Sequence, residues 1–290
     1  MTLVPTTRLR RTLVGVVAAT IAAGTTAAVV APDGAEARPD ARPAYGLTTA
    51  GKLVTFDLRR PQEARYVGTV TNLGGQDLVG IDVRPANGRL YGVGREGGVF
   101  TIDPRTARAT RVGRIDQQLR GASFGVDIDP VTDQLVVVSN RSQNLRFDFA
   151  DRSTASGRPL NYTNQVGYNT RVEGVTAIAF TNNDAASVTG TALYGIDTAK
   201  DRLVLQAPVN LGIITPQGGL DRSVSFRAGL DVHSTYLRGT RRTRTALNTL
   251  YATVGSQGRY GLFTADPLTG HLERVGTFPM PVADLAVVQD

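Results

Sequence analysis

Short runs in which apolar and polar residues alternate, each bounded by turn-forming residues, make up most of the chain. The clearest stretch covers 78–113, where four such runs follow one another within 36 residues. The first two are separated by Pro85-Ala86-Asn87-Gly88, in which proline presets one turn dihedral and Asn-Gly tolerates positive φ. Alternation with such turns predicts antiparallel β-strands. We expect these strands at 78–84, 89–94, 99–103 and 108–113.

A similar four-strand unit recurs along the chain. Its starts are spaced by 45, 49, 55 and 54 residues, and fall at Gly80, Gly125, Gly174, Gly229 and Ala283. Five units of this length predict an all-β fold, a five-bladed β-propeller in which each blade packs on its neighbours. A β-sandwich or an irregular barrel is the alternative, because short strands at regular spacing occur in all three architectures.

The first unit is one strand short. Strands are expected at 44–47, 52–57 and 65–70, whereas the apolar segment 282–288 has no partner in its own part of the chain. We expect 282–288 to complete the first blade. Pairing of N- and C-terminal strands would close the ring and remove the open edge that a linear stack exposes.

The first 37 residues have the parts of a secretory signal. Three arginines form a basic start, residues 12–30 are almost uncharged and rich in Ala and Val, and Ala35-Glu36-Ala37 offers the small residues that a signal peptidase recognises. We expect cleavage after Ala37, a linker at 38–43 and the propeller at 44–290. The protein is thus expected to be secreted or extracytoplasmic, by Sec or Tat export. The alternative is an uncleaved signal that anchors it in the membrane.

Composition adds few constraints on function. The absence of cysteine excludes disulfides, thiol catalysis and cysteine-ligated zinc. Without residues 1–37 the chain has 29 basic against 23 acidic residues, a net charge of +6. Such a surface attracts acidic polysaccharides in a generic, salt-sensitive way. No phosphate-binding loop or dinucleotide motif occurs, and no specific nucleic acid is expected as a partner.

Three aspartates stand in the same setting, Gly-apolar-Asp-apolar, at the start of a unit: Asp82, Asp127 and Asp231. If these strands are innermost, the carboxylates gather near the channel axis. There they would bind a ligand, either by holding a divalent cation such as Ca²⁺ or by shifting one carboxyl pKa far enough for acid or base work. The alternative is that each accepts backbone hydrogen bonds between blades. His233 follows Asp231 by two residues and is a candidate general base beside it.

A dense polar stretch lies at 140–146. Its amides and guanidinium groups would recognise a sugar or a phosphate, through Asn140, Gln143, Asn144 and Arg146. The alternative is a hairpin loop whose amides satisfy its own backbone.

A cluster of arginines lies between the first two strands of the last unit, at Arg238, Arg241, Arg242 and Arg244. It would bind an acidic polymer, and the alternative is a solvated loop.

No complete catalytic set is present, and we predict no catalytic residue. Gly121-Ala122-Ser123-Phe124-Gly125 fits the Gly-x-Ser-x-Gly pattern of hydrolases, but that motif requires a strand before it and a helix after it. Here the serine opens an expected β-strand. The second histidine, His271, follows a turn and is expected on the surface.

Several segments carry a family resemblance. Residues 123–130, 133–140 and 143–146, together with 191–198 and 203–206, resemble the bacterial domain-of-unknown-function family 4394, over about residues 44–288. The resemblance implies an exported, propeller-like protein. It supplies no activity and no catalytic residues.

The sequence therefore favours an exported, non-catalytic binding or scaffold protein of the cell envelope. Its expected partner is an envelope protein, an acidic polysaccharide or a small sugar. The alternative is a hydrolase or lactonase-like enzyme that acts on a sugar or lactone through carboxylates of the channel.

Overall fold

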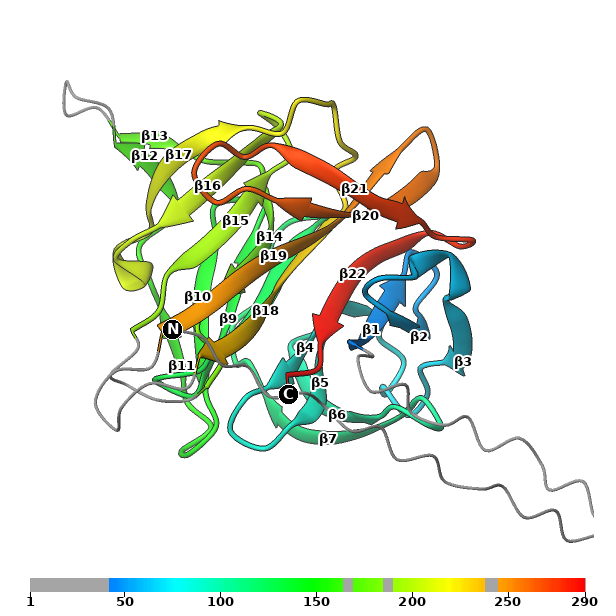
Figure 1. The fold of residues 1–290 in the computed structure, drawn as a ribbon. Coiled ribbons are helices and arrows are strands. Elements are labelled where there is room, and N and C mark those ends of the chain that lie inside the picture. The colour runs from blue at the N-terminus through cyan, green and yellow to red at the C-terminus, as the bar shows by residue number, and fades with distance from the viewer. Residues whose placement is uncertain (1–41, 164–168, 185–189, 238–244, 290) are drawn as a thin grey trace, which may run out of the picture. The chain divides into compact units, whose positions relative to one another are not determined.

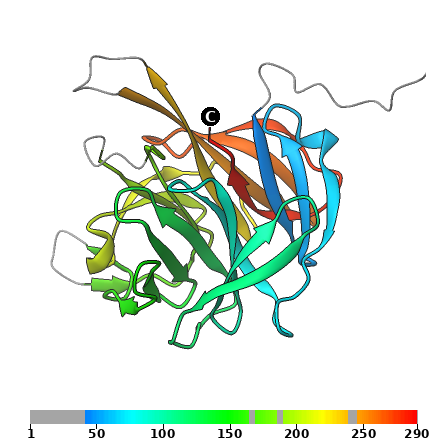
Figure 2. The same ribbon diagram turned by 90° about the horizontal axis from the view of Figure 1, so that it is seen from below.

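The computed structural model describes residues 42–163, 169–184, 190–237 and 245–289. These residues form five sheets arranged as a five-bladed β-propeller around a central channel (Figures 1 and 2). No α-helix occurs among them, and two short 3₁₀ helices, η1 (Pro61–Glu63) and η2 (Val209–Leu211), lie in connections. The predicted fold class is confirmed.

In each blade the strands follow one another from the channel outward. The first blade contains β22 (Val282–Val287), β1 (Pro43–Thr48), β2 (Lys52–Asp57) and β3 (Arg65–Thr69). The second contains β4 (Leu78–Arg84), β5 (Arg89–Gly94), β6 (Gly98–Asp103) and β7 (Arg108–Arg114). The third contains β8 (Phe124–Asp129), β9 (Gln134–Ser139), β10 (Asn144–Asp148) and β11 (Thr154–Ser156). The fifth contains β18 (Ala228–Leu237), β19 (Thr245–Ser256), β20 (Arg259–Ala265) and β21 (Leu272–Thr277).

The fourth blade is larger than the repeat predicts. Its regular strands are β14 (Val175–Phe180), β15 (Leu193–Asp197), β16 (Arg202–Gln206) and β17 (Ile213–Gly219). Beyond β17 the sheet continues into β12 (Asn161–Thr163), which pairs parallel to β17, and β13 (Asn169–Arg171). This hairpin precedes the inner strand in sequence, so it joins the blade from the connection between the third and fourth units.

The ring is closed as predicted. β22 pairs antiparallel with β1, from Ala44 opposite Val287 to Thr48 opposite Val282. The inner strand of the first blade therefore comes from the far end of the described chain, and no open edge separates the first blade from the fifth.

Pairing with the second strand of each blade fixes which inner residues are equivalent. Tyrosines of the second strand lie opposite Asp82, Ala179, Asp231 and Ala286, and Val136 lies opposite Asp127. The start of each unit lies two positions before these equivalent residues. The five starts are therefore Gly80, Gly125, Ala177, Gly229 and Asp284. The predicted starts at Gly174 and Ala283 were therefore wrong. In β14 a register shift between Val175 and Ala177 displaces the pattern, and no aspartate marks the strand.

Five hydrophobic clusters form the core, and each contains side chains of two successive blades. Val136 and Val138 of the third blade, for example, pack with Ile178 and Phe180 of the fourth. The fold is thus held together at the five blade interfaces, because no single blade has a core of its own.

The inner strands approach each other so closely that a methyl group does not fit at Gly125. A Cβ atom there would lie 2.8 Å from the backbone nitrogen of Ile178 and 2.9 Å from the carbonyl carbon of Ala177, both in the next blade. We expect Gly125→Ala to lower the free energy of unfolding by about 1–3 kcal/mol. Gly219→Ala is the matched control, since no atom lies within 4 Å of its Cβ position. Urea unfolding of both variants checks this, and equal effects would contradict it.

Candidate functional site

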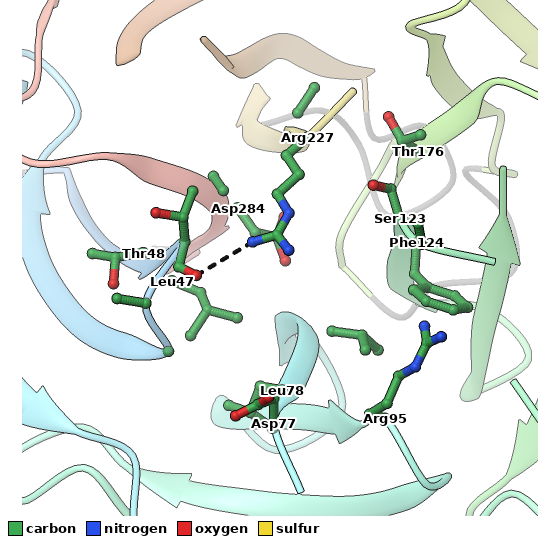
Figure 3. A pocket seen from close by; sticks show the side chains of 17 residues that line it. Leu47, Thr48, Asp77, Leu78, Arg95, Ser123, Phe124, Thr176, Arg227 and Asp284 are labelled. Atoms are coloured by element: carbon green, nitrogen blue, oxygen red, sulfur yellow. Dashed lines mark hydrogen bonds between the residues drawn. The ribbon is translucent and has the colours of Figure 1, made fainter. Parts of the chain in front are cut away.

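One end of the channel opens into a cavity of about 460 Å³ (Figure 3). It lies where the inner strands begin, so residues from several blades line it, among them Leu78, Phe124, Thr176, Ala228 and Ala283. Its charged lining residues are Arg95, Arg227, Asp77 and Asp284. A concave site with a few convergent polar groups is the usual form of a ligand site.

The two guanidinium groups of this cavity have no carboxylate within ion-pair distance among the described residues. Arg227 Nη1 donates to the carbonyl oxygen of Thr49 at 3.3 Å, and Arg227 extends toward the middle of the cavity (Figure 3). The Arg95 guanidinium lies 5.0 Å from the centre of the Phe124 ring. Both positive charges remain available to an anionic group.

Ser123 lies in the wall of the same cavity. Its side chain is buried, and its Oγ has no hydrogen-bond partner in the part of the chain that the structure describes. β8 begins at the next residue and no helix follows it, so the local fold is not that of a hydrolase elbow. The hydroxyl oxygen is covered by its surroundings, and no hydrogen bond to a base among the described residues activates it as a nucleophile.

A second cavity of about 660 Å³ lies beside the first, and Arg95 lines both. Its other basic lining residues are Arg120, Arg141 and Arg171. Arg141 Nη1 lies 3.7 Å from a carboxylate oxygen of Glu173. Arg141 belongs to the polar stretch 140–146 that the sequence singled out, whereas Arg95, Arg120, Arg171 and Arg227 were not predicted, because no local charge run marks them.

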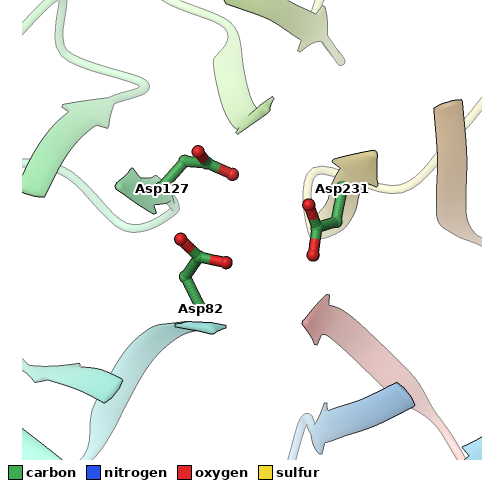
Figure 4. Close-up of side chains that lie close together, drawn as sticks. All are labelled: Asp82, Asp127 and Asp231. Carbon is green, nitrogen blue, oxygen red and sulfur yellow. The ribbon is translucent and has the colours of Figure 1, made fainter. Parts of the chain in front are cut away.

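The predicted carboxylates do converge in the channel (Figure 4). Asp82, Asp127 and Asp231 are each at most 5% exposed, and one oxygen of each lies within 4.8 Å of the others. This spacing admits a cation with Ca²⁺–oxygen distances of about 2.3–2.6 Å. A fourth aspartate, Asp284, lies nearby at the position equivalent to Gly80 and was not predicted.

The same three carboxylates bind the backbone of every blade. Together they accept one backbone N–H from the inner strand of each blade, at 2.5–3.2 Å. Asp82 accepts from Val83 and Ile128, Asp127 from Phe180, and Asp231 from Val232 and Val287. Asp284 accepts from Ile81 at 2.9 Å. Ala179 and Ala286 take the aspartate position in the fourth and first blades. In the blade that follows each of these, the aspartate accepts the N–H of the residue directly after it, Val232 for Asp231 and Val83 for Asp82. The cluster is therefore a structural hub as well as a candidate ligand site.

Burial is the main cause of the raised pKa values in this cluster. It raises the pKa of Asp231 to about 7, and burial together with the neighbouring carboxylates raises the pKa of Asp82 and Asp127 well above the usual value. The pKa of Asp284 is raised in the same way. Charges this close cannot all remain ionised in a low-dielectric interior, so protons or a cation must neutralise part of them.

The other predicted residues have distinct surroundings. His233 is buried in β18, two residues beyond Asp231, and its Nδ1 lies 3.5 Å from Thr235 Oγ1. His271 is exposed, and its Nδ1 lies 2.6 Å from a carboxylate oxygen of Asp221. Neither histidine lines either of the two cavities.

The amides of 140–146 mainly organise their own loops. Asn140 Oδ1 accepts from the backbone N–H groups of Ala122 and Ser123. The side chain of Gln143 accepts one backbone hydrogen bond through its oxygen and donates one through its nitrogen. The Asn144 amide nitrogen donates to two carbonyl oxygens, whereas its buried Oδ1 has no partner in the described chain. Gln143 and Asn144 line the second cavity, and Arg146 lies within β10, outside both cavities.

Two predictions fall outside the described residues. The arginine loop with Arg238, Arg241, Arg242 and Arg244 lies in 238–244, and the expected signal lies within 1–41. Among the residues that are described, no helix has the length and apolarity needed to cross a bilayer.

Solved structures similar to this chain share little sequence with it. A protein of unknown function from Bacteroides thetaiotaomicron is 15% identical, with a TM-score of 0.48, over 86% of this chain and 67% of that one. An auxiliary nutrient binding protein from Bacteroides ovatus is 14% identical, with a TM-score of 0.39, over 73% and 55%. The Malassezia sympodialis allergen Mala s 1 is 14% identical, with a TM-score of 0.39, over 78% and 76%.

No curated protein matches the chain at a significant level. A family model does match, over residues 52–286, which include strands of all five blades. The chain therefore belongs to the family described as domain of unknown function DUF4394.

Proposed function

We propose that this protein is an exported, non-catalytic binding protein of the cell envelope that takes its ligand in the cavity at the channel end. The supporting observation is the lining of that cavity. It contains two guanidinium groups that no described carboxylate neutralises. Charged groups that no protein carboxylate neutralises in a concave site are the ones an anionic ligand would bind.

The export part of the proposal rests on the sequence of residues 1–37, which has a basic start, an apolar stretch and a small-residue cleavage site. The non-catalytic part rests on the carboxylates. Asp82 and Asp231 each accept two backbone N–H groups, and Asp127 accepts one, so their orientation serves the blades. The enzymatic alternative is supported by the raised pKa of Asp231, a property shared by many general acids.

Filling the cavity tests the proposal. Ala122 is exposed and lines the cavity, so a tryptophan there would occupy ligand space without entering the core. Ala86→Trp is the matched control, since Ala86 is exposed in the turn between β4 and β5, at the far end of the inner strand.

Binding would be followed by calorimetry with glucose, galactose, N-acetylglucosamine, glucuronate and galacturonate as probes. We expect at least one sugar to bind the unaltered protein and Ala86→Trp. Ala122→Trp should weaken that binding by about tenfold or more, and NMR should recover the sugar unchanged. Conversion of the sugar would favour the enzyme, and undiminished binding by Ala122→Trp would place the ligand elsewhere.

A further inference from the structure

The two cavities together form one basic surface. Their lining contains five arginines, and Arg95 belongs to both cavities, so the cavities meet at its side chain. The carboxylates in the two linings are Asp77, Glu173 and Asp284. Of the five arginines only Arg141 has a carboxylate within ion-pair distance among the described residues. The remaining four belong to separate segments of the chain, and they are Arg95, Arg120, Arg171 and Arg227.

Guanidinium groups in such a surface recognise carboxylates or phosphates through paired N–H donors. A bare polyanion is a poor match here, because the first cavity also contains the carboxylates of Asp77 and Asp284. Their carboxyl oxygens accept hydrogen bonds, so hydrogen-bond donors on the ligand suit them. A ligand that carries both an anionic group and several hydroxyl donors satisfies both kinds of lining residue.

The lining also argues against a nucleic acid. Sequence-independent binding of single strands relies on aromatic side chains on which bases stack. Within the part of the chain that the structure describes, Phe124 is the one aromatic residue lining the two cavities, and it is buried with the Arg95 guanidinium over its ring. Among the described lining residues, no aromatic face is left open for a base.

From this lining we infer that the protein binds an oligosaccharide of uronic acids, laid across the two cavities. One sugar carboxylate would be held by Arg227 in the first cavity and another by Arg95 where the two cavities meet, with hydroxyl groups donating to Asp77 and Asp284. A carboxylate of a neighbouring sugar would be held by Arg120 and Arg171 in the second. The inference rests on the proposed function, because it names the ligand class of the same cavity.

Two arginines at opposite ends of one strand provide a matched pair of variants. β5 spans Arg89–Gly94, so Arg89 begins it at the far end of the blade and Arg95 follows it at the cavities, about 20 Å away. Arg95→Gln and Arg89→Gln remove the same charge from the same blade. Arg227→Gln tests the opposite wall of the first cavity.

The probes are trigalacturonate, its methyl ester and inorganic phosphate, titrated into the protein at about 0.15 M salt, where long-range attraction is screened. We expect trigalacturonate to bind, and the uncharged methyl ester to bind at least about tenfold more weakly. Arg95→Gln and Arg227→Gln should each weaken trigalacturonate binding by about tenfold, and Arg89→Gln by less than about twofold.

Each of the following results would overturn the inference, and each for a different reason. If the methyl ester binds as tightly as the acid and Ala122→Trp abolishes both, the cavity binds a neutral sugar, and the proposed function stands without this ligand class. If phosphate binds as tightly as trigalacturonate, the surface attracts anions without recognising a sugar. Absence of trigalacturonate binding, or equal effects of Arg89→Gln and Arg95→Gln, also excludes it.

Discussion

Asp231→Ala is expected to lower the free energy of unfolding by about 2–6 kcal/mol, since it leaves two buried backbone N–H groups without an acceptor at about 1–3 kcal/mol each. These groups belong to Val232 in the fifth blade and Val287 in β22, the strand that closes the ring. Alanine itself fits this inner position, because Ala179 and Ala286 occupy it in two other blades. The expected loss therefore comes from the hydrogen bonds.

Asp127→Ala is the matched control. It removes the same atoms from an equivalent position but leaves only the N–H of Phe180 unpaired, and both substitutions relieve repulsion within the cluster. We expect it to destabilise the protein by less than half as much as Asp231→Ala in urea unfolding at about pH 5, below the raised pKa of Asp231, where the cost of ionising this carboxyl does not offset the lost hydrogen bonds. Equal effects of the two variants would show that the number of backbone donors does not determine the role of these aspartates.

The second large effect concerns pH: the propeller is expected to lose stability as the pH rises from about 4 to above 7. Burial raises the folded-state pKa of Asp231 to about 7, above its unfolded value, and shifts those of Asp82 and Asp127 in the same direction. Between the unfolded and folded pKa values the folded state binds more protons, so stability falls with rising pH. For Asp231 the difference corresponds to about 4 kcal/mol.

Surface carboxylates act in another pH window. Hydrogen bonds lower the pKa of Asp148 and Asp266, so their contribution is lost only as the pH falls below about 4. Unfolding midpoints measured from about pH 4.5 to 8 with a chelator should thus decrease steadily, and Asp231→Ala should flatten the curve. A parallel series with Ca²⁺ distinguishes neutralisation of the cluster by protons from neutralisation by a bound cation. A Ca²⁺-dependent gain at about pH 7.5 would show that a bound ion neutralises the cluster, and would contradict neutralisation by protons alone.

Local sequence sufficed for most of the strands and for the closure of the ring, but β11, β12, β13 and β17 were not predicted. Turn chemistry such as Asn87-Gly88 marks strand ends directly, and the predicted 78–84 and 89–94 coincide with β4 and β5. Segment 282–288 was assigned to the first blade because it lacked a local partner, and its pairing with β1 confirms this. These inferences need only short-range pattern and the requirement that edges be paired.

The site was only partly visible in the sequence. The repeated Gly-apolar-Asp pattern identified three carboxylates of the channel, because the repeat places them at one position of the inner strand. Asp284 stands at another position, and Arg95 and Arg227 lie in unrelated connections. Their meeting at one end of the channel depends on the circular arrangement of the blades and on which turns face that end. No local pattern encodes this arrangement.

The pairing of β22 with β1 also has a kinetic consequence. β1 ends at Thr48 and β22 begins at Val282, so the first blade waits for a strand more than 230 residues away. Contacts at such sequence separation form late and slow the folding of a chain. Until β22 arrives, Val83 and Ala286 cannot share a packed interface, and the edge of β1 stays open to pairing with other chains. The step that completes the ring is therefore also the step that ends exposure to aggregation.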